Sequence, residues 1–185
     1  MDHPTIIFFV LLFLLGGVIL SLPSSMKKKK PKLGVFGYRL IYSDTRGWGG
    51  KNAVRSKLLK SEKDDVSGKP DYIYKHMLLN RLIPIELKSG EIKNETMPHK
   101  GDLLQLGAYF LIIEEVYGVR PGKGHLIYKD YMFIVRNTKR LRKDVRTTLG
   151  DMRRMLKDGE GTANASFVNC RHCVCRGTVC KEYTE

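Results

Sequence analysis

Two short, strand-like runs, each with a carboxylate at the same end of the expected pair, constrain this chain more than any other feature. Residues 71–75 (DYIYK) and 82–88 (LIPIELK) are rich in β-branched and aromatic residues and are joined through a polar turn. This pattern predicts the two antiparallel strands of a hairpin. Asp71 opens the first strand and Glu86 lies near the end of the second, so the two carboxylates are expected to meet.

The chemistry expected of this pair follows from its electrostatics. Carboxylates held about 4 to 5 Å apart repel each other in a low-dielectric cleft, and a hard divalent cation with oxygen ligands relieves that repulsion. Because side chains alternate along a strand, Lys88 shares the face of Glu86, and Leu87 points into the other layer. Lys88 would then steady a phosphate or position an attacking water beside the metal. A solvated salt bridge across the strands is the alternative interpretation.

A second Glu-x-Lys tripeptide, at residues 91–93, provides an internal comparison. It lies in a polar segment without a strand pattern. Glu86 and Lys88 instead belong to an apolar strand that follows the sequence Gly-Lys-Pro-Asp and precedes a helix. The surrounding sequence, rather than the tripeptide itself, therefore marks Glu86 and Lys88 as the functional pair.

Residues 102–117 form the strongest predicted helix, because apolar residues recur there at helical spacing. Asp102, Gln105 and Tyr109 share one stripe of this helix, at spacings i, i+3 and i+7. Polar side chains on a largely buried helix need partners, and a metal and phosphate site beside the hairpin would provide them. The alternative is a partly exposed helix face.

The remaining periodic segments complete a predicted α/β domain. Residues 35–42 alternate as a strand, and residues 125–128 and 131–135 predict a second hairpin that extends the same sheet. Residues 138–155 predict a basic amphipathic helix, which is either a solvated face or a contact for nucleic-acid phosphates. The formal charge of +14 and the isoelectric point near 9.7 favour a polyanionic partner, either nucleic acid or an anionic membrane surface.

An uncharged, apolar run over residues 6–22 predicts a membrane anchor. Its 17 residues would span about 25 Å as a helix, within the range tolerated for a bilayer core of roughly 30 Å. The lysines at residues 27–30 follow the run, and the positive-inside rule then assigns everything downstream to the cytoplasm. A cleaved signal peptide is the competing interpretation, but it requires basic residues before the apolar run. We expect an anchor at residues 1–25 and a basic linker at residues 26–34 that lies against anionic headgroups.

All four cysteines lie in a tail over residues 159–185, at Cys170, Cys173, Cys175 and Cys180. A cluster of this kind predicts metal ligands in a cytoplasmic protein and disulfides in an exported one. The lysines after the anchor favour the cytoplasm, so we expect a bound metal.

Four motifs, in this order, resemble the RecB-like branch of the PD-(D/E)XK nucleases. They are Gly68-Lys-Pro-Asp71, Ile85-Glu-Leu-Lys-Ser-Gly90, Gln105-Leu-Gly-Ala-Tyr109, and a Cys-x2-Cys with a later cysteine. The chain is most similar to the CRISPR-associated exonucleases that carry a C-terminal cysteine cluster. The resemblance implies an α/β nuclease core over residues 35–158, with a mixed central sheet flanked by helices. It also implies Mg²⁺- or Mn²⁺-dependent cleavage of DNA, typically from single-stranded ends.

The same resemblance assigns roles to individual residues in the nuclease core. Carried over by position, these are the metal ligands Asp71 and Glu86, the carbonyl of Leu87, the catalytic lysine Lys88, and the helix residues Gln105 and Tyr109, which orient the lysine and the DNA. The family also tends to have an upstream His or Glu as a third metal ligand, and no histidine lies between His3 and His76. Asp102 on the helix stripe, or Asp44, would replace it.

In the tail, Cys170, Cys173 and Cys180 resemble three ligands of a [4Fe-4S] cluster. The family usually draws a fourth cysteine from a position before the nuclease core, whereas residues 1–169 of this chain contain none. Cys175 or His172 would have to substitute, which leaves Zn²⁺ as the alternative to the iron-sulfur cluster.

Three functions of different classes follow from these observations. The first is a metal-dependent DNA exonuclease tethered to the cytoplasmic face of the membrane, working with CRISPR adaptation or DNA-repair proteins. The second is a catalytically inactive nucleic-acid-binding module with the same core. The third is a membrane-anchored zinc or redox protein whose cysteine tail is the functional part. Divalent-metal-dependent degradation of single-stranded DNA separates the first from the other two.

Overall fold

The computed structural model of the 185-residue chain describes residues 28–29, 35–44, 54–55, 57–93, 95–159 and 170. The chain divides into two compact units, Met1–Thr138 and Lys139–Glu185. The predicted anchor and most of the basic linker lie outside the described residues. Among the helices in the described part of the chain, none is long and apolar enough to cross a membrane.

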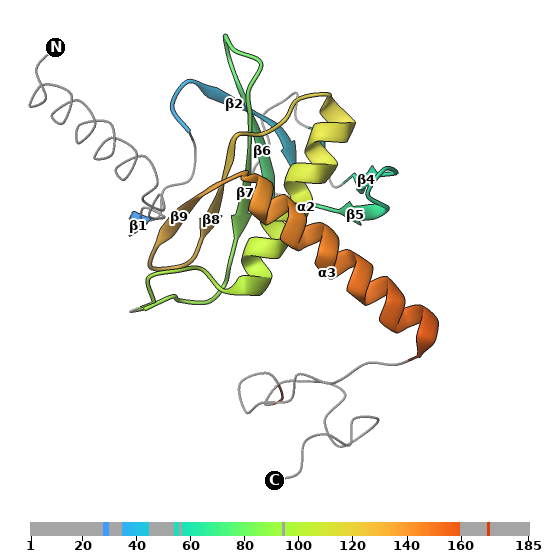
Figure 1. Ribbon diagram of the computed structural model, residues 1–185. Coiled ribbons are helices and arrows are strands. Elements are labelled where there is room, and N and C mark those ends of the chain that lie inside the picture. The colour runs from blue at the N-terminus through green and yellow to red at the C-terminus, as the bar shows by residue number, and fades with distance from the viewer. Residues whose placement is uncertain are drawn as a thin grey trace, which may run out of the picture. The chain divides into compact units, whose positions relative to one another are not determined.

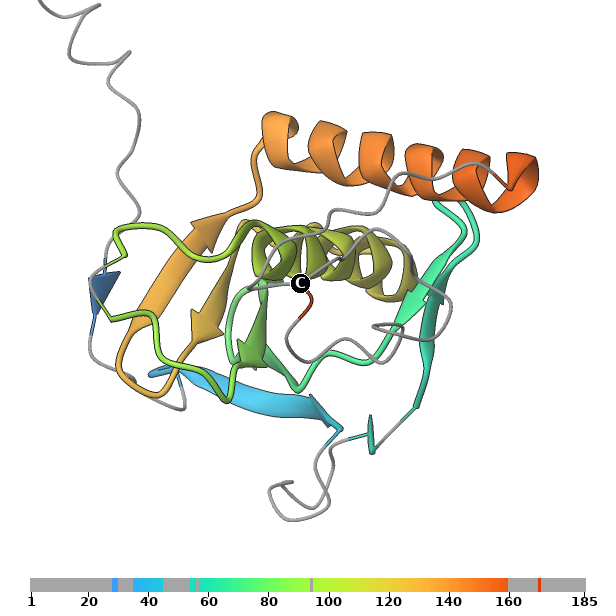
Figure 2. The same ribbon diagram turned by 90° about the horizontal axis from the view of Figure 1, so that it is seen from below.

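A mixed sheet forms the centre of the first unit (Figures 1 and 2). Its longer strands follow the spatial order β9-β8-β7-β6-β2. Their bounds are β2 Tyr38–Ser43, β6 Tyr72–His76, β7 Leu82–Leu87, β8 Lys123–Ile127 and β9 Met132–Arg136. The two-residue strands β1 (Lys28–Lys29) and β3 (Val54–Arg55) pair with β9 and β2, respectively. Among the longer strands, β7 and β8 are parallel and the other neighbours are antiparallel.

Both predicted hairpins are confirmed. β6 and β7 pair in a register that sets Tyr72 against Ile85, and β8 and β9 pair in the same antiparallel sense. The strand predicted over residues 35–42 begins only at Tyr38, because Gly37 adopts a φ of 78° and turns the chain before it. The predicted α/β class, with a mixed sheet and helices, is thereby confirmed.

Helix α2 (Lys100–Tyr117) connects the parallel strands β7 and β8. It begins two residues earlier than predicted and ends at Gly118, whose φ of 64° lies in the left-handed region that terminates helices. On one side it packs against β7 and β8, and on another against β4 (Leu59–Ser61) and β5 (Val66–Gly68), which form a separate two-stranded sheet. Apolar residues on several faces of α2 are therefore buried.

The close approach of α2 to the main sheet depends on a glycine. A Cβ atom at Gly124 of β8 would lie 3.0 Å from both Leu106 and Phe110. A side chain at this position would require the Leu106 and Phe110 side chains to shift.

A carboxylate fixes the small sheet to the end of α2. Glu115 accepts hydrogen bonds from the main-chain N–H groups of Glu62 (3.0 Å) and Lys63 (3.3 Å), and Ser61 donates its hydroxyl to the same carboxylate. The Ser61 hydroxyl and these two N–H groups favour the charged form, so the pKa of Glu115 lies below its usual value. The turn between β4 and β5 is thus held by a charge-assisted contact.

The other face of the main sheet carries its own apolar cluster, to which Val35, Tyr38 and Leu40 add partly buried side chains. Its buried members are Tyr72, Tyr74, Ile83, Ile85, Ile127 and Met132. Leu87 has the same strand parity as Ile83 and Ile85, but it is 37% exposed rather than buried in this layer. β6 begins opposite Ile85, so Leu87 extends beyond the first residue of that strand.

The second unit contains helix α3 (Lys139–Asp158), which confirms the helix predicted over residues 138–155. Its sequence carries eight Lys and Arg residues against three Asp residues. Val145 is buried, whereas Met152, Met155 and Leu156 are exposed.

Replacing Phe110 tests how strongly the packing of α2 stabilises the first unit. The side chain is fully buried, so Phe110→Ala should lower the free energy of unfolding by about 3 to 5 kcal/mol through the cavity that it leaves. The control is Val116→Ala on the same helix, because Val116 is 43% exposed. The control should change the free energy by less than about 0.5 kcal/mol. Equal denaturation midpoints for the two variants, measured by circular dichroism, would contradict this packing.

Candidate active site

The β6–β7 hairpin brings Asp71 and Glu86 together, as the sequence predicts. Asp71 directly precedes β6, and the pairing of Tyr72 with Ile85 sets it opposite Glu86. Its Oδ2 atom accepts a hydrogen bond of 2.6 Å from the main-chain N–H of Leu87. The residue before Asp71 is a fully buried proline, Pro70, whose restricted backbone helps to fix the position of the carboxylate.

Lys88 is the centre of a polar network between β7 and α2. Its Nζ atom lies 2.9 Å from Asp102 Oδ1 and 3.3 Å from Glu86 Oε1, and it donates a hydrogen bond of 2.6 Å to Gln105 Oε1. The Lys88 and Glu86 side chains are largely buried. The side chains of Glu86 and Lys88 therefore lie on the same face of the strand, as predicted. Asp102 and Gln105 of the helix stripe are the other partners of Lys88.

Gln105 connects the lysine to the rest of the site. Its Nε2 atom donates hydrogen bonds to Glu86 Oε1 (2.6 Å) and to the hydroxyl of Tyr109 (2.9 Å). The Tyr109 hydroxyl in turn donates to the main-chain carbonyl of Lys69 (3.1 Å). With a cation on its oxygen and a carboxylate on its nitrogen, the Gln105 amide has one favourable orientation.

Gly68, the first residue of the Gly-Lys-Pro-Asp motif, also contributes to this network. A Cβ atom at Gly68 would lie 2.8 Å from Cε1 of Tyr109. Only glycine leaves room for the tyrosine that receives the Gln105 hydrogen bond. The motif therefore positions both a carboxylate and the helix residue that faces it.

Tyr128 is a site residue that the sequence analysis did not single out. It is buried, and its hydroxyl donates a hydrogen bond of 2.5 Å to Asp102 Oδ2. It follows β8, and the Lys88 N–H donates to the carbonyl of Ile127, the residue before it. The sequence signal that could have identified Tyr128 is its position at the end of β8, the strand that runs parallel to the Glu-x-Lys strand.

The two predicted substitutes for a third metal ligand have different surroundings. Asp102 is engaged by Lys88 and Tyr128. Asp44 lies beside Asp71, since its N–H donates to the Asp71 carbonyl (3.0 Å) and its negative charge helps to raise the pKa of the Asp71 carboxyl.

Burial raises the pKa values of both paired carboxyl groups. For Glu86, burial and then the negative charge of Asp71 raise the pKa to about 7. For Asp71, burial again is the largest cause of a raised pKa. Burial alone would lower the pKa of Lys88, but the hydrogen bond to Asp102 and the charges of Glu86 and Asp102 outweigh it, so this pKa is raised.

The arrangement fits a divalent cation. In the part of the chain that the structure describes, Glu86 Oε2 is buried without a hydrogen-bond partner. An ion would satisfy that oxygen and offset the cost of ionising two carboxyl groups whose pKa values are raised mainly by burial. Among the described residues, no group of three His, Cys, Asp or Glu side chains is arranged to hold a metal. The chain would thus offer two carboxylates and the predicted Leu87 carbonyl, and Mg²⁺ typically completes such a set with water and substrate phosphate.

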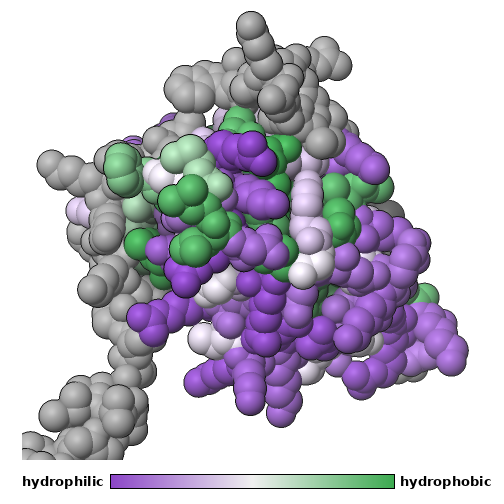
Figure 3. Space-filling model, turned by 90° about the horizontal axis from the view of Figure 1, so that it is seen from above, coloured by the Kyte–Doolittle hydropathy of each residue, from purple (hydrophilic) through white to green (hydrophobic). Residues whose placement is uncertain are grey.

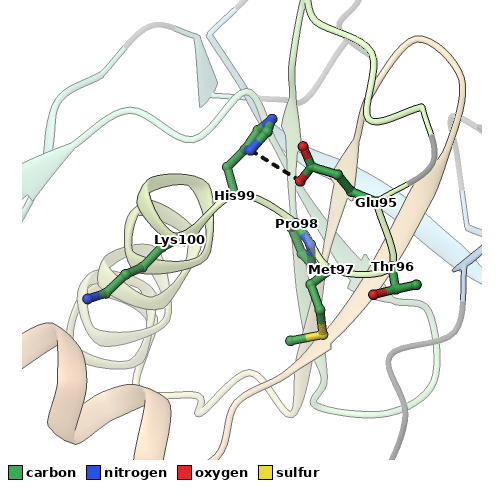
Figure 4. A pocket seen from close by; sticks show the side chains of 6 residues that line it. All are labelled: Glu95, Thr96, Met97, Pro98, His99 and Lys100. Carbon is green, nitrogen blue, oxygen red and sulfur yellow. Dashed lines mark ion pairs between the residues drawn. The ribbon is translucent and has the colours of Figure 1, made fainter. Parts of the chain in front are cut away.

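A separate depression lies at the start of α2, where residues 95–100 line a volume of about 480 Å³ (Figure 4). Its Glu95 and His99 side chains point toward each other, with Oε2 and Nδ1 3.6 Å apart, and Lys100 points away from them. The carboxylate pair does not line it. The polar network, rather than this depression, carries the recognisable chemistry.

Of the predicted cluster in the tail, the described residues include Cys170, which is buried. Cys173, Cys175, Cys180 and the alternative ligand His172 lie outside the described residues. The iron-sulfur or zinc site stays a prediction.

No protein-family model matches this sequence, and no characterised protein matches it either. The interpretation of the site therefore depends on its motifs and its geometry.

The raised pKa of Glu86 predicts how the metal-free protein responds to pH. The Glu86 carboxyl has a pKa of about 7 in the folded chain, against an ordinary value of 4.5, so the folded state binds more protons than the unfolded state between those pH values. Stability should therefore fall as pH rises from about 4.5 to 7, by up to about 3 kcal/mol. Glu86→Gln should flatten this dependence in chelator-treated samples, measured by denaturant unfolding at several pH values. A Glu86→Gln profile parallel to that of the wild type would contradict the assignment.

Proposed function

We propose that this protein is a divalent-metal-dependent deoxyribonuclease with a PD-(D/E)XK core of the RecB-like branch, held at a membrane by its N-terminal segment. The observation that carries the proposal is the network around Lys88. Glu86, Gln105 and Asp102 surround one ammonium group, while Asp71 and an unsatisfied Glu86 oxygen lie next to it. The mixed sheet with α2 on one face agrees with the core that the motifs imply.

The roles of the residues follow from their charges and contacts. Asp71, Glu86 and the Leu87 carbonyl would hold Mg²⁺ or Mn²⁺, which would supply Lewis acidity and an activated water. Lys88 has a raised pKa and therefore stays protonated at neutral pH. It serves as a donor to a phosphate oxygen or to the attacking water, and not as a general base.

Gln105 and Tyr109 position this donor. Gln105 fixes the lysine through a hydrogen bond and is itself fixed by Glu86 and Tyr109. A preorganised donor of this kind stabilises charge that develops on a phosphate during cleavage without paying for reorientation at that step. The charge of +14 favours a polyanionic substrate, and the motifs favour single-stranded DNA ends.

The proposal is tested by incubating the full chain with end-labelled single-stranded DNA and Mg²⁺ or Mn²⁺. Lys88→Ala should abolish cleavage and leave DNA binding largely unchanged, because the lysine acts in the transition state. The matched control is Lys93→Ala in the second Glu-x-Lys tripeptide, which should cleave like the wild type. Cleavage that persists in Lys88→Ala or in chelator would refute the proposal.

Tyr128→Phe tests the part of the network that only the structure revealed. Loss of the hydrogen bond to Asp102 should loosen the Lys88 ammonium and lower kcat by up to about tenfold with little change in KM. Tyr131→Phe, at a nearby tyrosine in the same turn, is the control. A fall in KM, or a kcat equal to that of the control, would show that the Tyr128 hydroxyl does not help to position Lys88.

Helix α3 is expected to contact the phosphate backbone. Lys143→Gln with Arg146→Gln should weaken binding to single-stranded DNA and reduce the slope of log K against log salt by about 1.4, at about 0.7 for each phosphate contact. The control is Lys60→Gln, because the Lys60 ammonium already forms an ion pair with the Glu62 carboxylate at 2.8 Å. An unchanged slope would identify α3 as a solvated helix.

A catalytically inactive nucleic-acid-binding module is the second candidate. It is favoured by the finding that the described residues contain no three-residue His, Cys, Asp or Glu cluster for a metal. DNA binding without turnover in Mn²⁺ would select it. A role for the cysteine tail as an iron-sulfur or zinc site, and a connection to CRISPR adaptation or DNA repair, belong to the same proposal as expectations from the motifs.

A further inference from the structure

An exposed apolar tip lies at the end of the main sheet remote from the carboxylates. It consists of Phe36, before β2, and of Met77, Leu78 and Leu79, in the connection between β6 and β7. Their exposed fractions are 102%, 64%, 91% and 46%, respectively. The β6–β7 connection projects beyond the sheet in Figure 1, and Figure 3, which looks from above onto that end, shows hydrophobic surface bordered by hydrophilic surface. Four large apolar side chains gathered in this way mark an interaction surface.

The tip is held in place by hydrogen bonds. The N–H groups of Leu78 and Leu79 donate to Nδ1 of His76, at 3.1 and 3.0 Å. Met77 N–H donates to the carbonyl of Gly37 (3.0 Å), which ties the two loops together. The chain therefore presents these apolar side chains to the outside in a fixed arrangement, although burying them elsewhere would be more favourable in water.

Basic residues lie in the same chain segments as the tip. Arg39 and Arg81 are exposed and Lys75 is half-buried. The sheet register pairs Arg39 directly with Lys75, a cross-strand arrangement of like charges that is destabilising by itself. Residues 35–40 and 75–82 contain no Asp or Glu. An anionic surface would offset this repulsion.

We propose that the apolar tip inserts into the interface of an anionic lipid bilayer while the basic residues of the same segments contact the headgroups. Apolar side chains beside a polar, cationic face are the features of peripheral membrane contacts, and each basic residue near an anionic surface adds to the attraction. The tip is convex, so a protein partner would need a matching pocket, whereas a bilayer receives a protrusion without one. The apolar run at residues 6–22, for which the sequence predicts a membrane anchor, would be a second membrane-directed element.

The sheet register sets the distance between the candidate site and the tip. β1 pairs with the first residues of β9, at the sheet end that carries the carboxylates. That end lies about 17 Å from the tip, the length of the five residues of β6. A bilayer contact at the tip would place the candidate site at the far end of the sheet, on the side accessible to a polymer in solution, and would move Lys28–Lys29 away from the headgroups that the sequence analysis assigns to the basic linker.

The test measures the depth of a single side chain in the full chain bound to vesicles. Leu78→Trp is compared in phosphatidylcholine and phosphatidylserine vesicles with ordinary or brominated acyl chains, and the emission of the native Trp48 in the wild type is subtracted. The matched control is Leu58→Trp, at an apolar residue that is 55% exposed before β4. Emission from position 78 should be quenched by brominated chains, and emission from position 58 should not.

Arg39→Gln with Lys75→Gln should reduce the dependence of this quenching on phosphatidylserine. If Leu78→Trp misfolds, as judged by circular dichroism, Met77→Trp provides the same measurement. Equal quenching at positions 78 and 58, absence of vesicle binding, or a blue-shifted emission at position 78 that bromine does not quench would each overturn the proposal, the last by indicating a protein contact. Neither metal nor DNA is present, so the result does not depend on the proposed nuclease activity.

Discussion

The buried carboxylate of Glu86 is the constraint on which the candidate site depends. Water is excluded from most of its surface, and the charge of Asp71 adds to the cost of ionising it. Gln105 and Lys88 satisfy Oε1, whereas Oε2 has no hydrogen-bond partner among the described residues. A fold that stabilised only itself would gain by replacing this carboxylate with an apolar side chain. The metal ion proposed above would offset this cost.

The supporting elements are arranged around that carboxylate. The parallel connection from β7 through α2 to β8 returns the chain beside Lys88, so one helix face and two strand ends converge. Glycines 68 and 124 let the helix and Tyr109 approach the strands closely. Glu115 holds the small sheet against the far end of the same helix. Site residues such as Gln105 and packing residues such as Leu106 thus alternate along the same part of one helix, and a polar contact holds its far end.

The candidate site and the apolar tip lie at opposite ends of the same hairpin. Asp71 and Glu86 lie where the strands begin and end, and Met77 to Leu79 lie where they are connected. Their separation is consequently fixed by strand length rather than by a flexible link. If both proposals hold, one β-hairpin sets the orientation of the chemistry relative to the membrane.

Much of the site could be predicted from the sequence because its residues are close together in short, regular elements. Strand alternation alone sets Glu86 and Lys88 on one face, and helical spacing alone groups Asp102, Gln105 and Tyr109. The tertiary structure decided how the hairpin and the helix face each other. It paired Asp102 with Lys88, added Tyr128 from the end of a parallel strand, and left Leu87 exposed. These contacts join residues that are distant along the chain, and local periodicity carries no information about which strand will lie next to which.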